Sequence, residues 1–103
     1  MNSTLTIYQI KPGQIEPLMA LIKEVNQKKE EALSGLKEAH MFVESIFIHD
    51  NRLYVLKVCE DINLMKERQS GSQLDLYKPI REVMAQCLEP VSEVNSTAGF
   101  YNL

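Results

Sequence analysis

The chain has 103 residues, of which 45% are hydrophobic and 24% charged, with a net charge of −3 at pH 7. This length fits one core, so residues 1–103 are expected to form a single domain. The acidic balance argues against nucleic acid as a partner, because phosphate contacts need a cluster of Lys and Arg that outweighs local acid. The N-terminus lacks the pattern of a signal peptide and no apolar run is long enough to span a membrane, so no membrane partner and a cytoplasmic location are expected.

The first half of the chain begins with a predicted strand. Residues 4–11, TLTIYQIK, are rich in β-branched side chains and alternate in the manner of a strand, which the Pro12-Gly13 pair ends. Residues 14–37 carry apolar side chains at helical spacing and predict one long amphipathic helix. Pro17 fits that helix only in its first turn, where the missing amide hydrogen has no intrahelical acceptor.

Residues 40–60, HMFVESIFIHDNRLYVLKVCE, predict two strands joined by Asp50-Asn51. Asp and Asn tolerate the positive φ angles of a tight hairpin turn. A two-residue turn there places Glu44 directly opposite Lys57 and Phe42 opposite Cys59. Both faces of the hairpin come out mainly apolar.

The second half of the chain predicts a helix in two segments and a last strand. Asp61 is expected to cap the first segment, the Ser70-Gly71-Ser72 stretch to interrupt the helix, and Asp75 to cap the second segment. Pro90 is expected to end that segment. The last strand is predicted within residues 91–102, which include Phe100 and Tyr101.

The resulting order, β-α-β-β-α-β, is that of an α+β, ferredoxin-like fold: a four-stranded antiparallel sheet with helices on one face. Because both faces of the hairpin are apolar, the face of the sheet that the helices do not cover carries a large apolar patch. A second copy of the chain, packed sheet to sheet about a two-fold axis, is the expected cover, so a homodimer is predicted.

The stretch KPGQIEPL after the first predicted strand is similar to the strand-to-helix connection of the dimeric α/β-barrel superfamily. That superfamily includes antibiotic-biosynthesis-type monooxygenases and mutarotase-like isomerases. The stretch MFVESIFI, followed by a second strand and later by Cys87-Leu88, resembles one uncharacterised bacterial family within it. The resemblance covers nearly the whole chain. It implies a ferredoxin-like protomer in a dimeric α/β barrel, and it implies no particular activity, because that family has none established.

The link before the last helix departs from the family pattern. In relatives it resembles Ser-x-His-Pro-Ile-Asp, whereas this chain has SGSQLD at residues 70–75. Asp75 is kept, and Ser72 stands at the histidine position. Any chemistry that depends on that histidine in relatives is therefore expected to be lost or altered here.

Glu44 and Lys57 are the central candidate site residues, and two interpretations of them stay open. In the first they wall a ligand pocket, where desolvation tunes Glu44 into a proton-transfer base. In the second they form a cross-strand ion pair that fixes the register and contributes up to about 1 kcal/mol. Tyr8 and Tyr54 are expected to lie near one another and either line the same cavity or act as core residues with solvated hydroxyls.

The other titratable residues give fewer signals. His40 is a candidate for proton transfer, with a structural role as the alternative. Arg81, near Tyr77 and Lys78 at the start of the last helix, either binds an anion at that N-terminus or is solvated. Cys59 and Cys87 form no CxxC pair and are expected to be buried, reduced thiols. No metal and no cofactor are predicted, because no His/Asp/Glu cluster supplies ligands.

Two classes of function remain open on the sequence. The first is a small-molecule-binding protein or cofactor-independent enzyme of the dimeric α/β-barrel type, with Tyr8, Glu44, Tyr54 and Lys57 as polar lining. The second is a noncatalytic regulatory or structural assembly module that uses its sheet only as an interface. A third, RNA binding by stacked aromatic residues, is opposed by the acidic charge.

Overall fold

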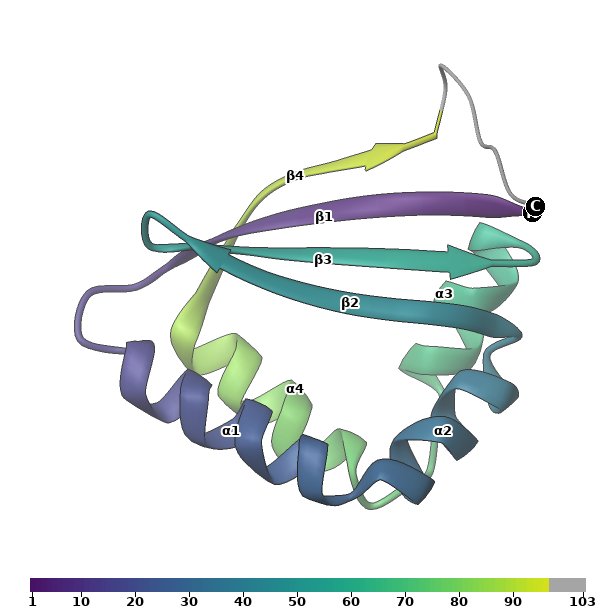
Figure 1. Cartoon of the computed structure of the whole chain (residues 1–103), viewed down its shortest axis with the longest axis horizontal. Coiled ribbons are helices and arrows are strands. Elements are labelled where there is room, and N and C mark those ends of the chain that lie inside the picture. The colour runs from purple at the N-terminus through teal and green to yellow at the C-terminus, as the bar shows by residue number, and fades with distance from the viewer. Residues whose placement is uncertain (97–103) are drawn as a thin grey trace.

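The computed structural model describes residues 1–96 of the chain. The elements are β1 (Asn2–Ile10), α1 (Ile15–Gln27), α2 (Lys29–Glu38), β2 (Met41–His49), β3 (Arg52–Cys59), α3 (Ile62–Ser70), α4 (Tyr77–Cys87) and β4 (Leu88–Asn95). The strands form one antiparallel sheet in the order β2-β3-β1-β4. All four helices lie on one face of the sheet (Figure 1). The predicted ferredoxin-like fold is therefore confirmed, with each of its two helices divided in two.

The hairpin of β2 and β3 has the predicted register over most of its length. Pairs run from Val43 opposite Val58 to His49 opposite Arg52, and Glu44 lies opposite Lys57. The prediction for Phe42 was wrong, because a β-bulge between Met41 and Val43 shifts the register and pairs Met41 with Cys59. The extra residue of a bulge has no partner on the facing strand, and Phe42 is 53% exposed.

The turn of this hairpin has the backbone that its sequence predicts. Asp50 and Asn51 have φ angles of 49° and 60°. The turn also contacts β1, since the Asn51 carbonyl accepts hydrogen bonds from Ile10 N at 2.8 Å and from Gln9 Nε2 at 3.0 Å. The turn thus fixes both the hairpin register and the position of β1.

Replacing Asn51 with valine is expected to lower the free energy of unfolding by about 1–2 kcal/mol, because a β-branched side chain is strained at a positive φ angle. Asn51→Gly is the matched control. It is expected to stay within about 0.5 kcal/mol of the parent protein, since glycine adopts this backbone without strain. Equilibrium unfolding in urea measures both. Equal loss in the two variants would show that the asparagine side chain, and not the φ angle, matters here.

The predicted long helix over residues 14–37 is two helices, which corrects the sequence interpretation. Lys28 has φ −106° and ψ 47°, outside helical values, and separates α1 from α2. The break falls in the polar run NQKKEE, where no side chain is buried to hold one continuous helix against the sheet. It lets α1 pack against α4 while α2 packs against β2 and α3.

The second helical half is interrupted as predicted, after α3. The Asp61 side chain caps α3, accepting a hydrogen bond from Leu64 N at 2.8 Å. The expected cap by Asp75 is wrong, because α4 has no side-chain cap from its own segment. Instead Glu31 of α2 accepts a hydrogen bond from Leu76 N at 2.8 Å, so a distant carboxylate satisfies that amide.

The last strand begins earlier than predicted. β4 starts at Leu88, directly after α4, so Pro90 lies inside the strand instead of ending the helix. Proline is tolerated there because β4 is an edge strand and its register with β1 shifts between Ile7 and Tyr8. The part of the predicted strand beyond residue 96, with Phe100 and Tyr101, lies outside the described residues.

Two separate hydrophobic clusters hold the helices to the sheet. The first contains Ile10, Leu18, Leu53, Val55, Cys87 and Leu88. The second contains Ala39, Met41, Cys59 and Met65. Because Leu53 is near the start of β3 and Cys59 is its last residue, the clusters lie toward opposite ends of that strand, and the space between them is where a cavity forms.

The face of the sheet away from the helices, called here the outer face, is strongly apolar. It carries alternate residues of each strand, of which Ser3, Ser45 and Ser92 are polar and the apolar ones are Leu5, Ile7, Val43, Phe47, Tyr54, Leu56, Val58 and Val94. Phe47 is 55% exposed and Val94 is 53% exposed. Among the helices of residues 1–96, none has the length and apolar character needed to cross a membrane.

Candidate functional site

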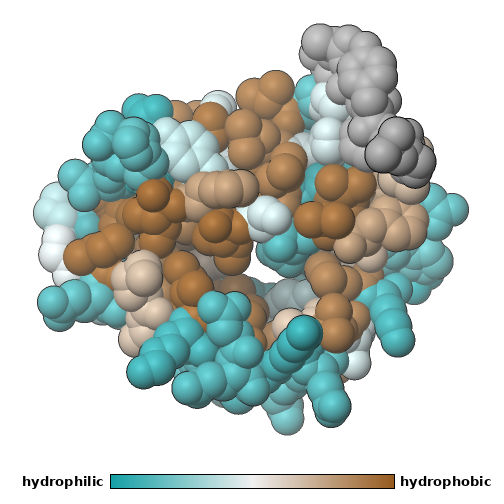
Figure 2. All heavy atoms as spheres, in the orientation of Figure 1, coloured by the Kyte–Doolittle hydropathy of each residue, from teal (hydrophilic) through white to brown (hydrophobic). Residues whose placement is uncertain are grey.

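A cavity of about 590 Å³ lies between the sheet and the helices, and it is called here the central cavity. Figure 2 shows the hollow below the sheet with hydrophobic residues around it. Helices α1 and α4 pack on one another on the side of the first hydrophobic cluster, and α2 and α3 pack on the side of the second. The break at Lys28 and the loop after Ser70 therefore bend the helical layer over this space (Figure 1).

Most of the cavity wall is apolar. The aliphatic residues come from the sheet, from α1, α2 and α4, and from the end of the loop before α4, and they are Leu18, Leu21, Ile22, Val25, Ala32, Ile46, Leu53, Val55, Leu76, Ile80 and Met84. The amphipathic pattern of α1 and α4 predicts that these faces turn inward. A ligand with a sizeable carbon skeleton would bury that skeleton against this wall.

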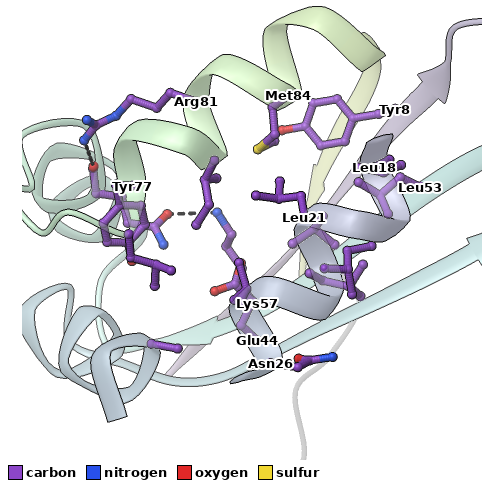
Figure 3. Close-up of a pocket in the computed structure, with 18 of the residues that line it drawn as sticks. Tyr8, Leu18, Leu21, Asn26, Glu44, Leu53, Lys57, Tyr77, Arg81 and Met84 are labelled. Atoms are coloured by element: carbon purple, nitrogen blue, oxygen red, sulfur yellow. Dashed lines mark hydrogen bonds between the residues drawn. The ribbon is translucent and has the colours of Figure 1, made fainter. Parts of the chain in front are cut away.

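The polar part of the wall centres on Lys57. Lys57 lies opposite Glu44 in the sheet, yet the two side chains form no ion pair. The interpretation of the pair as a register-fixing salt bridge is therefore wrong. The Lys57 Nζ atom instead donates to Oε1 of Gln69 at 2.8 Å (Figure 3). Gln69 Nε2 in turn donates to Met41 Sδ at 3.2 Å. Gln69, at the end of α3, holds the ammonium in place.

Glu44 is the anionic group of the wall. It lies on the edge strand β2, is exposed, and has neither a hydrogen bond nor an ion pair with any residue of 1–96. Burial, followed by the charges of Glu93 and Glu44, raises the pKa of Tyr8. Burial, followed by the charge of Glu44, raises the pKa of Tyr77. A phenol is protonated at neutral pH at its ordinary pKa of about 10, and the upward shifts keep both groups protonated at still higher pH, so both can donate hydrogen bonds inside the cavity.

Arg81 lines the cavity but its guanidinium also holds the chain. Its Nη2 atom donates to the carbonyl oxygens of Gln69, Ser70 and Ser72 at 3.2, 3.4 and 3.0 Å. Its Cζ atom lies 5.8 Å from the centre of the Tyr77 ring. Arg81 thus fastens the loop between α3 and α4 and contributes a positive charge to the wall.

The sequence candidates divide between several places. Tyr8, Glu44, Lys57 and Arg81 all line the central cavity. Tyr54 does not share it with Tyr8: Tyr54 pairs with Ile7 and lies on the outer face, so of the two alternatives left open for these tyrosines the shared cavity is the one that the register contradicts. The physical reason is the alternation of strand side chains, which separates neighbours in register onto opposite faces.

His40 lies away from the central cavity. It links α2 to β2 with a φ angle of 54°, and its Nδ1 atom is 3.4 Å from Glu60 Oε2. Together with Asp61 and Glu67 it borders a separate surface depression. In the described part of the chain no group of three or more His, Cys, Asp or Glu side chains could hold a metal ion.

Ser72 and the two cysteines are buried structural elements. Ser72, at the position of the family histidine, is 5% exposed, and its Oγ atom accepts a hydrogen bond from Leu74 N at 3.3 Å. Cys59 and Cys87 are free, buried thiols, as predicted, one in each hydrophobic cluster. Burial, followed by the charge of Asp61, raises the pKa of Cys59, which keeps that thiol protonated and unreactive.

Sequence reasoning missed Gln69, Lys66, Ser70 and Asn26 as lining residues. Gln69 and Ser70 lie at the end of α3, whose apolar pattern is weak, so no periodicity marked the side that faces the cavity. Lys66 forms an ion pair with Glu93 of β4, a contact across 27 residues that no local pattern signals.

Gly35 of α2 controls the position of Tyr77. A Cβ atom at Gly35 would lie 2.5 Å from the Tyr77 hydroxyl oxygen. Gly35→Ala is expected to push the Tyr77 ring toward the cavity. Because the cavity offers room and alanine favours a helix by about 1 kcal/mol over glycine, stability should change by less than about 1 kcal/mol. Ring chemical shifts measure the displacement.

The matched control is Gly35→Ala in a Tyr77→Phe background. Removing the hydroxyl removes the atom nearest to the new methyl group. The change in the ring chemical shifts caused by Gly35→Ala should therefore be smaller in the Tyr77→Phe background. Unchanged ring shifts in Gly35→Ala alone would contradict the contact between α2 and Tyr77.

The fold and the site define the class of protein: this is a ferredoxin-like α+β protomer with a cavity between its sheet and its helices. A NIPSNAP domain protein from Burkholderia xenovorans is similar over 100% of this chain and 99% of its own, with TM-score 0.65 and 13% identity. A candidate antibiotic biosynthesis monooxygenase from Nitrosomonas europaea is similar over 98% and 100% of the two chains, with TM-score 0.66 and 14% identity.

Tetracenomycin F2 cyclase from Streptomyces glaucescens, a type II polyketide cyclase, is similar over 98% of this chain and 85% of its own, with TM-score 0.57 and 16% identity. At these identities the likeness shows the fold alone. The chain belongs to a family of unknown function, DUF6176, whose model matches residues 1–101. A comparison with the curated proteins finds no match.

Proposed function

We propose that the protein binds an amphipathic small organic molecule in the central cavity. The observation that carries this proposal is the cavity itself. Protein interiors rarely contain voids much larger than a water molecule, whereas ligand pockets typically measure about 300–1,000 Å³. The central cavity, at about 590 Å³, lies within the size range of ligand pockets.

The character of the wall supports the same proposal. Long aliphatic surfaces with a few convergent polar groups are the usual make-up of small-molecule sites. Here Lys57, Glu44 and Tyr8 provide the polar groups among leucine, isoleucine and valine side chains. A purely structural module has no use for such a space, which favours binding over assembly alone. The fold is similar to that of a type II polyketide cyclase from Streptomyces glaucescens, and this likeness identifies no substrate here.

Within this proposal, Tyr8, Glu44, Lys57 and Arg81 contact the ligand. Glu44 is the group placed to accept a proton, because its carboxylate has no partner in the described chain. Tyr8 and Tyr77 act as donors, because phenols are neutral at physiological pH and both line the cavity. Tyr54 and His40 have no part in this site.

We further propose that two copies of the chain associate through the outer face. Apolar patches this continuous are rarely left exposed on monomers, and the largest exposed side chain there, Phe47, is 55% exposed in the protomer. Packing one sheet on another about a two-fold axis buries the same residues on both copies. The free, buried thiols Cys59 and Cys87 support a reducing compartment such as the cytoplasm.

The binding proposal is tested with N-phenyl-1-naphthylamine, a neutral probe that becomes fluorescent in apolar sites. Ala32→Phe adds a ring at the cavity wall, and Ala20→Phe adds the same ring on the exposed side of α1. The parent protein and Ala20→Phe are expected to bind the probe equally, and Ala32→Phe at least about tenfold more weakly, a loss of about 1.4 kcal/mol. Circular dichroism checks that both variants fold. Equal binding by all three proteins would contradict the proposal.

A further inference from the structure

The charges around the central cavity are unbalanced, although the chain as a whole is acidic. The lining contains the cations Lys57, Lys66 and Arg81 and a single carboxylate, Glu44. Lys66 is neutralised by Glu93, which lies just outside the wall. The lining residues alone thus carry more positive than negative charge, while Glu93 and Glu31, which accepts a hydrogen bond from Leu76 N at 2.8 Å, lie behind the wall. What distinguishes the three cations is whether each already has a partner.

Lys57 is the cation with unused binding capacity. An ammonium group has three donors, and Lys57 gives one of them to the neutral amide oxygen of Gln69. By contrast, Lys66 is paired with a carboxylate, and Arg81 is held by three carbonyl oxygens. No residue within the described range neutralises Lys57, so its charge is available to a molecule in the cavity.

The position of Lys57 divides the cavity in two. Figure 3 shows the side chain reaching into the middle of the cavity, with Tyr77 and Arg81 to one side and Leu21, Leu18 and Leu53 to the other. A molecule bound with a polar group at Lys57 can thus place that group toward the positive side and its carbon skeleton among the leucines.

Building on the proposed function, we propose that the central cavity selects amphipathic anions, with the anionic head group held by Lys57 and the carbon skeleton packed against Leu21 and Leu53. A carboxylate, sulfonate or phenolate head forms a charge-assisted hydrogen bond with the ammonium. Glu44, across the strand from Lys57, weakens anion binding by repulsion and accepts a hydrogen bond from any hydroxyl group beside the head. The preferred ligands are therefore hydroxylated aromatic or aliphatic acids.

The test compares two probes of nearly the same shape. One is 1-anilinonaphthalene-8-sulfonate, and the other is N-phenyl-1-naphthylamine, which lacks the sulfonate. Lys57→Met keeps the apolar stem and removes the charge. It is expected to weaken sulfonate binding about tenfold and to change binding of the neutral probe less than twofold, because one charged hydrogen bond is lost. Lys57→Arg should retain sulfonate binding, and Lys23→Met, on the exposed side of α1, is the control for charge removal.

Glu44→Gln is a second variant, in case Lys57→Met does not fold. It is expected to strengthen sulfonate binding several-fold and to leave the neutral probe unchanged, since it removes the repelling charge. Equal effects of Lys57→Met on both probes, or no effect of Glu44→Gln on either, would overturn the anion proposal. Those results leave cavity binding intact as long as Ala32→Phe weakens both probes. If Ala32→Phe weakens neither, the proposed function fails and this inference fails with it.

Discussion

Replacing Leu56 with glutamate is expected to dissociate the proposed dimer into monomers. Leu56 is on β3, a central strand, and pairs with Leu5 and Ser45 on the outer face. In the proposed dimer the two-fold axis places both copies of the new carboxylate in an apolar interface. Leaving a buried charge without a partner costs several kcal/mol, so the dissociation constant should rise at least about a hundredfold. Sedimentation velocity at micromolar concentration measures the change.

The control for this experiment is Leu33→Glu. Leu33 is also an exposed leucine, 46% accessible, but it lies on α2, away from the sheet. The same change in charge and size there should leave a dimer. A parent protein that sediments as a monomer at these concentrations would refute the dimer, and an unchanged dimer in Leu56→Glu would exclude the outer face as its interface.

Replacing Leu18 with alanine is expected to lower the free energy of unfolding by about 2–5 kcal/mol, the range for large-to-small substitutions in a core. Leu18 is 2% exposed and joins α1 to the first hydrophobic cluster. The effect is large relative to a total stability of about 5–15 kcal/mol, because the central cavity leaves this domain with two small clusters in place of one continuous core.

Urea unfolding of Leu18→Ala is best compared with Leu33→Ala. The same atoms are removed from an exposed position of α2, where the loss should not exceed about 0.5 kcal/mol. Similar losses at the two positions would mean that the first cluster does not carry the stability assigned to it.

Much of the fold could be predicted because short-range patterns control it. The Asp50-Asn51 pair forms a two-residue turn, and this turn sets the register that brings Glu44 opposite Lys57. Asp61 and the Ser70-Gly71-Ser72 stretch mark the beginning and the end of α3 through local backbone chemistry. These signals need no knowledge of the rest of the molecule.

The differences arise where distant parts of the chain meet. Glu31 replaces Asp75 as the partner of the first amide of the α4 region, over a separation of 45 residues. The break at Lys28 depends on α1 and α2 packing against different partners. No local pattern in the sequence predicts the Glu31–Leu76 hydrogen bond or the break at Lys28.

In the candidate site, too, local patterns predicted some features, and features that depend on distant segments were missed. Lys57 and Glu44 were placed together by the hairpin register, whereas Tyr8 and Tyr54 were expected near one another, with a shared cavity as one of two alternatives, and they lie on opposite faces. The adjacency of β1 and β3 follows from the fold, but their register does not, and a shift of one residue exchanges the two faces of a strand. Gln69, which orients Lys57, comes from a helix whose weak apolar pattern gave no direction.

A crystal structure of the protein with 1-anilinonaphthalene-8-sulfonate is the direct test of anion binding in the central cavity. We expect probe density in that cavity, with the sulfonate within hydrogen-bond distance of Lys57 Nζ and the aromatic rings against Leu21 and Leu53. A cavity closed by helices packed onto the sheet, with the probe bound only outside it, would contradict anion binding at Lys57.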